Sequence, residues 1–332
     1  MNNLLQVHQL VKYFPLRRDL FQRKREYVHA VDDVSFDLAD RETLGLVGES
    51  GCGKSTVGRS VLRLIEPTAG QVWYQGHNIL ALADRDIRPL RREMQIIFQD
   101  PYGSLNPRLT VERIVEEPLL THKIGNRHER ADKVDDALQM VGLQPEHKKR
   151  FPHEFSGGQR QRIMIARALI LKPRLVVGDE PVSALDVSVQ AQVLNLISRL
   201  QRQMNFACIF ISHDLGIIRY ISHRVAVMYL GRIVETAPVK ALYADPRHPY
   251  TVALLSAVPV PNPRHQKKRI ILEGDVPSPI NPPAGCRFHP RCPRRLDRCN
   301  QETPVMRITA ADHLVACHLY PEGPVWKPVL PQ

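Results

Sequence analysis

Residues 48–56 combine the residue types that bind phosphate groups in proteins. They fit the pattern GxxxxGK[ST] and read Gly48-Glu49-Ser50-Gly51-Cys52-Gly53-Lys54-Ser55-Thr56. Glycines let backbone amides turn toward phosphate oxygens, a lysine at this position reaches the β- and γ-phosphates, and the following hydroxyl ligates Mg²⁺. We call this segment the phosphate loop. It predicts a nucleotide site, and the alternative is a glycine-rich turn before a helix.

Two adjacent carboxylates follow an apolar segment further along the chain. Leu175 to Val177 predicts a buried strand, and Asp179 and Glu180 come shortly after it. Asp179 is suited to the ligand shell of Mg²⁺, and Glu180 to polarising an attacking water as a general base. The alternative is a solvated acidic turn.

A third candidate precedes a predicted helix and consists of Ser156, Gly157, Gly158 and Gln159. Bare backbone amides, a hydroxyl and the positive end of a helix can together bind an anion. An ordinary N-cap followed by glycines would give the same pattern.

These residues need a sheet and helices to position them. We expect strands over residues 4–11, 28–38, 42–47, 70–74, 94–98, 175–177, 207–211 and 224–228. We expect helices over 56–65, 159–171 and 188–205, and a mainly helical segment over 111–151. In the helix over 188–205, one apolar face carries Val189, Val193, Leu196, Ile197, Leu200 and Met204. Strands that alternate with helices predict an α/β fold with a parallel sheet, a helical insertion and an N-terminal β portion.

The composition changes near Asp245. The chain has 332 residues, a net charge of +12, 27 prolines and 6 cysteines. Residues 246–332 hold 16 of the prolines and four of the cysteines, although they make up about a quarter of the chain. We therefore expect a second unit, poor in regular structure, over 246–332.

The N-terminus has no signal pattern and Val252 to Pro261 is too short to span a bilayer, so we expect a cytoplasmic chain.

Over about residues 4–245 these motifs resemble those of the ATP-binding subunits of ABC transporters, which are P-loop NTPases with a helical subdomain, here about 100–155. The resemblance implies that the phosphate loop binds ATP, that Mg²⁺ is held by Ser55, Gln99 and Asp179, and that Glu180, His213 and Gln99 are catalytic. It implies that the ring of Phe14 stacks on adenine, with Tyr13 as the competing choice. It also implies that the signature motif, residues 156–159, caps the ATP of a partner subunit, and that Asp186 belongs to the D-loop. Gly178 departs from the pattern, and we expect only a packing effect.

Further segments narrow the resemblance to one of the two ATP-binding subunits of dipeptide and oligopeptide importers, the F-type subunit. These are residues 103–108 (GSLNPR), 247–250 (RHPY) and 277–286 (PSPINPPAGC). The resemblance implies a heterodimer with a D-type ATP-binding subunit, two permease subunits, an extracytoplasmic peptide-binding protein, and a place on the cytoplasmic face of the inner membrane. Importers of nickel, glutathione and antimicrobial peptides share much of the pattern, so the cargo and its length stay open.

Four cysteines in the last part of the chain could ligate a metal group: Cys286, Cys292, Cys299 and Cys317. Their spacings lack a C-x₂-C pair, which disfavours zinc, and a cytoplasmic chain disfavours disulfides. Four thiolates can hold a [4Fe–4S] cluster, as in this extension of related peptide importers, and nearby arginines would offset its charge. Free thiols and zinc remain the alternatives. Cys52 and Cys208 are expected to be small buried residues.

The positive charge raises the question of nucleic-acid binding, but no DNA- or RNA-binding pattern is visible and we expect no such partner. The basic run Arg17 to Arg25 suits anionic lipid headgroups or a solvated surface.

Two rival functions are a soluble ABC ATPase acting on ribosomes or DNA, and a regulatory subunit that does not hydrolyse ATP. The single core argues against the first, and Glu180, Ser156 and His213 argue against the second.

Overall fold

The computed structural model describes residues 3–16, 26–258 and 269–328. The chain divides into two compact units: unit 1 comprises Met1–Leu38, Leu44–Leu80 and Ser212–Gln332, and unit 2 comprises Ala39–Thr43 and Ala81–Ile211. The basic run Arg17 to Arg25 lies outside the described residues, so its role stays a prediction. Within the described ranges, no helix has the length and apolar character needed to cross a membrane.

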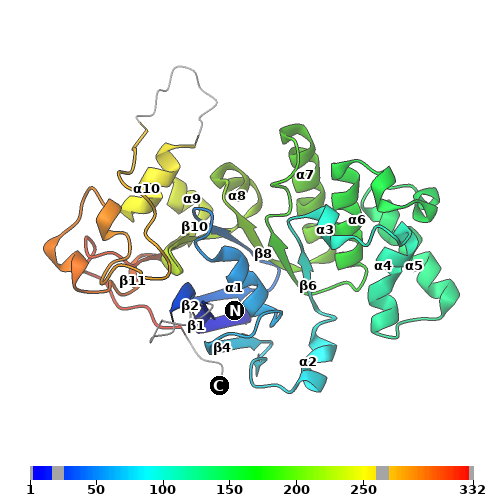
Figure 1. Cartoon of the computed structure of the whole chain (residues 1–332), viewed down its shortest axis with the longest axis horizontal. Coiled ribbons are helices and arrows are strands. Elements are labelled where there is room, and N and C mark those ends of the chain that lie inside the picture. The colour runs from blue at the N-terminus through cyan, green and yellow to red at the C-terminus, as the bar shows by residue number, and fades with distance from the viewer. Residues whose placement is uncertain (1–2, 17–25, 259–268, 329–332) are drawn as a thin grey trace. The chain divides into compact units, whose positions relative to one another are not determined.

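Unit 1 contains a sheet in which β1 (Asn3–Pro15) lies between β2 (Tyr27–Ala39) and β4 (Ala69–Tyr74), with the short β5 (His77–Asn78) beyond β4 (Figure 1). β1 and β4 pair antiparallel, with Leu5 opposite Tyr74. Branched and aromatic residues favour strands, and those of β1 and β2 supply much of the core, including Leu5, Val7, Leu10, Val31, Val34 and Phe36. The predicted N-terminal β portion is confirmed.

Unit 1 also holds strands in the order β11-β12-β10-β9-β3. Their bounds are β3 (Thr43–Val47), β9 (Arg224–Tyr229), β10 (Arg232–Pro238), β11 (Arg307–Ala310) and β12 (His313–Val315). β3 and β9 run parallel, whereas β10 pairs antiparallel with both β9 and β12. Residues 246–332 therefore contribute strands to this sheet. The expectation that they are poor in regular structure missed this pairing, because β11 and β12 are too short to show a pattern in the sequence.

Four helices of unit 1 accompany these strands: α1 (Lys54–Val61), α8 (Leu215–Ile221), α9 (Val239–Ala244) and α10 (Pro249–Ser256). Helix α1 starts at the lysine of the phosphate loop, slightly earlier than predicted. The other three were not predicted, since each spans only six to eight residues.

Unit 2 has a parallel set of strands in the order β8-β7-β6, namely β8 (Ala207–Ser212), β7 (Leu175–Asp179) and β6 (Met94–Ile97). Its helices are α2 (Asp84–Leu90), α3 (Pro101–Ser104), α4 (Val111–Thr121), α5 (Arg127–Met140), α6 (Gly157–Leu169) and α7 (Val187–Met204). The helical segment predicted over 111–151 is confirmed by α4, α5 and a 3₁₀ turn at Pro145–Lys149, and α4, α5 and α6 pack on one another.

The apolar face predicted for residues 188–205 is buried in α7 at its centre. Val193, Leu196, Ile197 and Leu200 are all buried, as the helical spacing requires. Gly178 in β7 fits the packing effect that we expected, because a Cβ there would lie 3.3 Å from Pro181 Cγ and 3.5 Å from Phe210 Cδ2.

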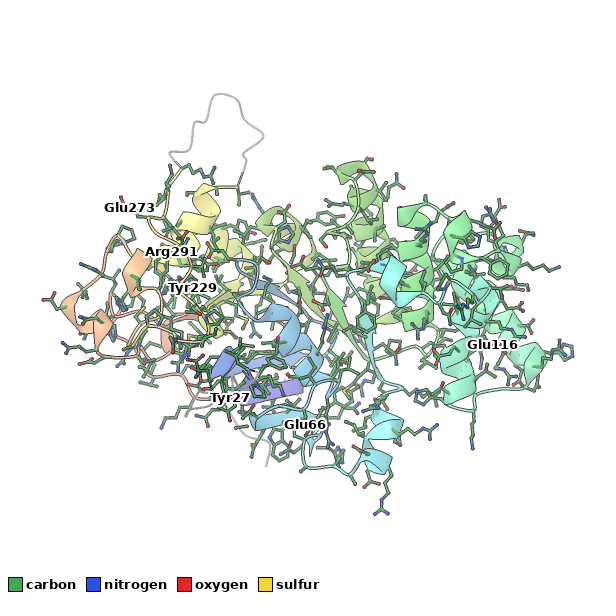
Figure 2. The ribbon with its side chains drawn as sticks, viewed as in Figure 1. Tyr27, Glu66, Glu116, Tyr229, Glu273 and Arg291 are labelled. Carbon is green, nitrogen blue, oxygen red and sulfur yellow. The ribbon has the colours of Figure 1, made fainter. Side chains whose placement is uncertain are left out.

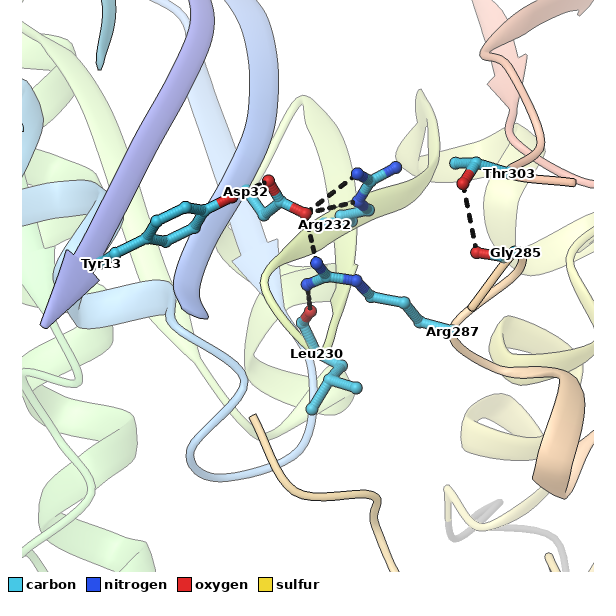
Figure 3. A network of polar contacts seen from close by, with 7 residues as sticks. All are labelled: Tyr13, Asp32, Leu230, Arg232, Gly285, Arg287 and Thr303. Atoms are coloured by element: carbon cyan, nitrogen blue, oxygen red, sulfur yellow. Dashed lines mark hydrogen bonds and ion pairs between the residues drawn. The ribbon is translucent and has the colours of Figure 1, made fainter. Parts of the chain in front are cut away.

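A buried carboxylate connects three parts of unit 1 (Figure 3). Asp32 on β2, whose side chain is 12% exposed, accepts a hydrogen bond from the Tyr13 hydroxyl of β1 at 2.6 Å. Arg232 of β10 donates to Asp32 Oδ2 at 2.9 and 3.1 Å, and Arg287 of the extension pairs with the same oxygen. Burial by itself would raise the pKa of Asp32, but the Tyr13 hydrogen bond and the two arginines lower it overall.

We predict that Asp32→Asn lowers the free energy of unfolding by about 3 kcal/mol at neutral pH, because it leaves two arginines without their buried partner. The matched control is Asp37→Asn, which removes a partner of Arg224 at a more exposed pair and should cost about 1 kcal/mol or less. Urea unfolding measures both.

The pH dependence follows from the lowered pKa of Asp32. A carboxyl with a lower pKa in the folded state stabilises the fold fully above its unfolded pKa of about 3.9 and loses this contribution as pH falls through the folded value. The difference between wild type and Asp32→Asn should therefore shrink below about pH 4. A difference that stays constant with pH would contradict this role.

Candidate nucleotide site

The phosphate loop connects β3 to α1 in unit 1, which is the context that its pattern requires. Lys54 is only 4% exposed, and its ammonium donates to the carbonyls of Gly48 (2.8 Å) and Glu49 (2.9 Å). The side chain therefore lies folded into the loop. This arrangement keeps a cation at the place where phosphate oxygens are expected.

Glycines of the loop have no room for a side chain. A Cβ on Gly48 would lie 2.1 Å from the Met228 carbonyl oxygen, and a Cβ on Gly53 would lie 2.0 Å from that of Ala30. Gly53 also has a φ of 102°, a conformation that L side chains rarely adopt. Close approach of neighbouring backbone thus dictates these two glycines.

Cys52 of the loop is buried, as predicted, and burial raises the pKa of its thiol. Its carbonyl accepts a hydrogen bond from the Gly231 amide at 2.9 Å. The turn between β9 and β10 therefore holds the middle of the loop.

In unit 2 the two predicted carboxylates lie at the end of β7. Asp179 is 1% exposed. Glu180 has a φ of 48°, which is uncommon for a residue other than glycine, and its amide donates to the Ile211 carbonyl at 3.1 Å. Such a backbone turns the Glu180 side chain away from the direction it would take in a continuing strand. The plain acidic turn is therefore the weaker interpretation.

Gln99 lies beside the acidic pair, although it is far from it in sequence. Its side-chain amide donates to Glu180 Oε2 at 3.3 Å and to Ser183 Oγ at 3.2 Å. Ser183 in turn donates to the Glu180 carbonyl at 3.1 Å. Unit 2 thus brings together Gln99 and Glu180, the two predicted catalytic residues that it carries.

The signature motif begins α6. Ser156 is the N-cap, its hydroxyl accepts from the Gln159 amide at 3.3 Å, and the Gln159 side chain accepts from the Ser156 amide at 3.0 Å. This is a capping box. A Cβ on Gly158 would lie 2.4 Å from Val189 Cγ1 of α7, so this glycine allows close helix packing. Asp186 immediately precedes α7 and is exposed.

His213 and the aromatic pair lie in unit 1. His213 follows β8 at an exposed position, and its neighbour Asp214 caps α8. The hydroxyl of Tyr13 binds Asp32, and its ring lies 4.2 Å from that of His29. Phe14, the next residue on β1, points to the other face of the strand. The Lys12 ammonium lies 4.9 Å from the centroid of the Phe14 ring, so both aromatic residues have a partner and the choice of Phe14 for adenine stays a prediction.

None of the four extension cysteines forms a disulfide in the described structure, and the Cys286 amide donates to the Cys299 carbonyl at 2.8 Å. Burial, with a smaller contribution from the charges of the neighbouring cysteines, raises the pKa of Cys286 to about 11 and that of Cys317 to about 12. Across the described ranges, no group of three or more His, Cys, Asp or Glu side chains is placed to hold a metal ion.

Sequence reasoning missed two contacts between the extension and the phosphate loop. The hydroxyl of Tyr250 accepts from the Glu49 amide at 2.9 Å, and the guanidinium of Arg291 pairs with the Glu49 carboxylate. The only available signal was the RHPY segment, which served as a mark of resemblance and not as a structural contact.

We predict that Gly53→Ala destabilises the fold far more than Gly51→Ala. Both residues have positive φ, but a Cβ on Gly51 meets nothing within 4 Å. Gly51→Ala should therefore lower the free energy of unfolding by only about 1 kcal/mol, which is the cost of a positive φ for alanine. Gly53→Ala should lower it further, because its Cβ must also displace the Ala30 carbonyl. Thermal unfolding compares the two, and equal losses would show that crowding does not dictate Gly53.

Comparisons with known families and proteins cover most of the chain. Residues 31–183 match the ABC transporter family, and residues 234–299 match the oligopeptide/dipeptide transporter C-terminal region. The oligopeptide transport ATP-binding protein AppF of Bacillus subtilis is 53% identical over 320 residues, which cover 96% of this chain and 97% of AppF. The probable peptide ABC transporter ATP-binding protein y4tS of Sinorhizobium fredii is 53% identical over 95% of this chain and 90% of its own.

Among solved structures, the dimeric ATP-binding cassette MJ0796 in a post-hydrolysis state bound to ADP and Pi superposes with a TM-score of 0.63. It is 26% identical, and the match covers 71% of this chain and 98% of that one. The P-loop fold and the resemblance read from the motifs are thereby confirmed. The chain belongs to the ATP-binding proteins of ABC transporters, in the group that carries the oligopeptide/dipeptide transporter C-terminal region.

Proposed function

We propose that this chain is the ATP-hydrolysing subunit that powers import of dipeptides or oligopeptides by a membrane ABC transporter. One observation carries the proposal: a complete set of hydrolytic motifs occurs on a chain whose C-terminal region matches oligopeptide transporters. AppF, which this chain resembles over nearly its whole length, is named for oligopeptide transport. A non-hydrolysing role is disfavoured, because Glu180, Ser156 and His213 are all present.

The site residues divide into binding and chemical roles. The phosphate-loop amides and Lys54 would bind the phosphates of ATP, and Phe14 would stack on its adenine. Ser55, Gln99 and Asp179 offer hydroxyl, amide and carboxylate oxygens, which are the hard ligands that Mg²⁺ prefers.

Glu180 would take the proton of the attacking water as general base, and His213 would contact the γ-phosphate. The signature motif (Ser156, Gly157, Gly158, Gln159) would cap the ATP of a partner subunit, with the D-loop Asp186 nearby. In this proposal the chain has two domains, an ATPase core over 1–245 and the extension over 246–332.

The partners follow from the same function. A chain of this kind works with permeases in the membrane, which we propose it meets from the cytoplasmic face of the inner membrane through its helical subdomain. We further propose that a D-type ATP-binding subunit completes a heterodimer and that an extracytoplasmic binding protein delivers the peptide. Co-purification from membranes with mass-spectrometric identification of the bound subunits tests these partners.

The extension cysteines suit a [4Fe–4S] cluster by chemistry, because four thiols and several arginines lie within one short region. The Cys286 amide donates to the Cys299 carbonyl at 2.8 Å, so the backbones of two of the four cysteines lie side by side. Their thiols are not gathered into a metal site in the described structure, so loading would require the sulfurs to converge.

We predict that Glu180→Gln in the assembled transporter abolishes peptide uptake and slows ATP hydrolysis by about 100-fold or more, while ATP stays bound. The reason is that an amide cannot accept the proton of the attacking water. Glu66→Gln is the matched control, since Glu66 is an exposed partner of Arg63. Unchanged uptake by Glu180→Gln would refute the mechanism.

Anaerobic purification tests the cluster. Protein that carries it should be brown and contain about four iron and four sulfide per chain. Cys292→Ser should lose the iron, whereas Cys208→Ser, which alters a buried cysteine of β8, should retain it. Stoichiometric zinc without iron, or no metal at all, would refute the cluster.

A further inference from the structure

The segment Cys286 to Cys292 reaches the phosphate loop through an ion pair. We call this segment the brace; it reads Cys286-Arg287-Phe288-His289-Pro290-Arg291-Cys292. The guanidinium of Arg291 makes two contacts with the Glu49 carboxylate, Nη1 to Oε2 at 2.9 Å and Nη2 to Oε1 at 3.3 Å. The Arg291 side chain is only 9% exposed. Paired, sheltered contacts of this kind are stronger than a surface ion pair.

Aromatic packing fixes the position of this pair. Arg291 lies near Tyr229 (Figure 2). The Tyr229 ring packs against those of Tyr250 (4.7 Å between centroids) and Phe288 (5.2 Å, interplanar angle 84°). The Tyr250 hydroxyl accepts from the Glu49 amide at 2.9 Å. Glu49 is thus held by both its backbone and its side chain.

The second arginine of the brace supports the loop from another side. Arg287 donates to the Leu230 carbonyl and pairs with Asp32 (Figure 3). Gly231, which follows Leu230 in the chain, donates its amide hydrogen to the Cys52 carbonyl at 2.9 Å. The brace therefore supports the phosphate loop at Glu49 directly and at Cys52 through one turn.

The charge of Glu49 is unfavourable for the ligand that this loop is expected to bind. Glu49 is the second residue of the phosphate loop, and its own carbonyl accepts from the Lys54 ammonium at 2.9 Å. A carboxylate carried by the phosphate loop repels a triphosphate unless a cation compensates the charge. Arg291 is the cation that the described structure places on this carboxylate.

We propose that Arg291 is a positioning residue for nucleotide binding. By pairing with Glu49 it neutralises a carboxylate that would otherwise oppose the phosphates of ATP. It acts through Glu49 and does not itself contact the nucleotide. This inference rests on the proposed assignment of residues 48–56 to ATP binding.

The test is calorimetric titration of the full-length chain with Mg·ATP. Arg291→Gln should weaken binding by about tenfold, because the Glu49 charge is then uncompensated. The double variant Glu49→Gln/Arg291→Gln should bind within about twofold of wild type, since the repulsion is gone. Arg291→Lys should fall between, because it keeps the charge but loses the two-point contact. Arg295→Gln is the matched control, an exposed arginine of the same extension.

A purely structural role for Arg291 would give no rescue by Glu49→Gln. Unchanged binding by Arg291→Gln, or equal weakening with and without Glu49→Gln, would therefore overturn the proposal. If Arg291→Gln does not fold, Glu49→Gln alone decides: it should bind ATP at least as tightly as wild type, and weaker binding would refute the proposal. Lys54→Ala tests the site itself, because normal ATP binding by that variant would refute the site assignment and not the brace.

Discussion

The organisation of unit 1 depends on one buried carboxylate. Asp32 accepts hydrogen bonds from Tyr13 and pairs with Arg232 and Arg287, so β1, β2, β10 and the extension meet at a single side chain. A buried charge is tolerated only when its partners are in place. The three partners come from segments far apart in sequence, and the position of each is therefore coupled to the others.

The phosphate loop lies within the same coupled region. Its Gly53 packs against the Ala30 carbonyl close to Asp32, its Cys52 carbonyl binds the Gly231 amide, and its Glu49 pairs with Arg291. Backbone crowding and ion pairs thus set the loop conformation before any ligand binds, and such preorganisation reduces the cost of ordering the loop on binding. The extension, which distinguishes this group of ATP-binding proteins, is part of the structure that shapes a loop found throughout the ABC family.

Much of the site could be read from the sequence because short motifs fix local geometry. The phosphate loop requires a strand before it and a helix after it, and both are present; α7 buries the face that its spacing predicted. Contacts such as Gln99 with Glu180 could be expected only through the resemblance, since residues distant in sequence give no local signal.

Other features had no signal at all. The strands β11 and β12 are short and gain their stability from pairing with β10, so propensity alone cannot find them. The positive φ of Glu180 and the pairing of Arg291 with Glu49 depend on tertiary packing. Two of the arginines among the cysteines, Arg287 and Arg291, also hold the ATPase core, and no local pattern indicates those contacts.

Because the brace contacts the phosphate loop at Glu49, nucleotide binding should affect both segments. Hydrogen–deuterium exchange of the full-length chain with and without Mg·ATP tests it most directly. We expect slower exchange both in residues 48–56 and in residues 286–292 when ATP is bound. Slower exchange in residues 48–56 with no change in 286–292 would contradict it.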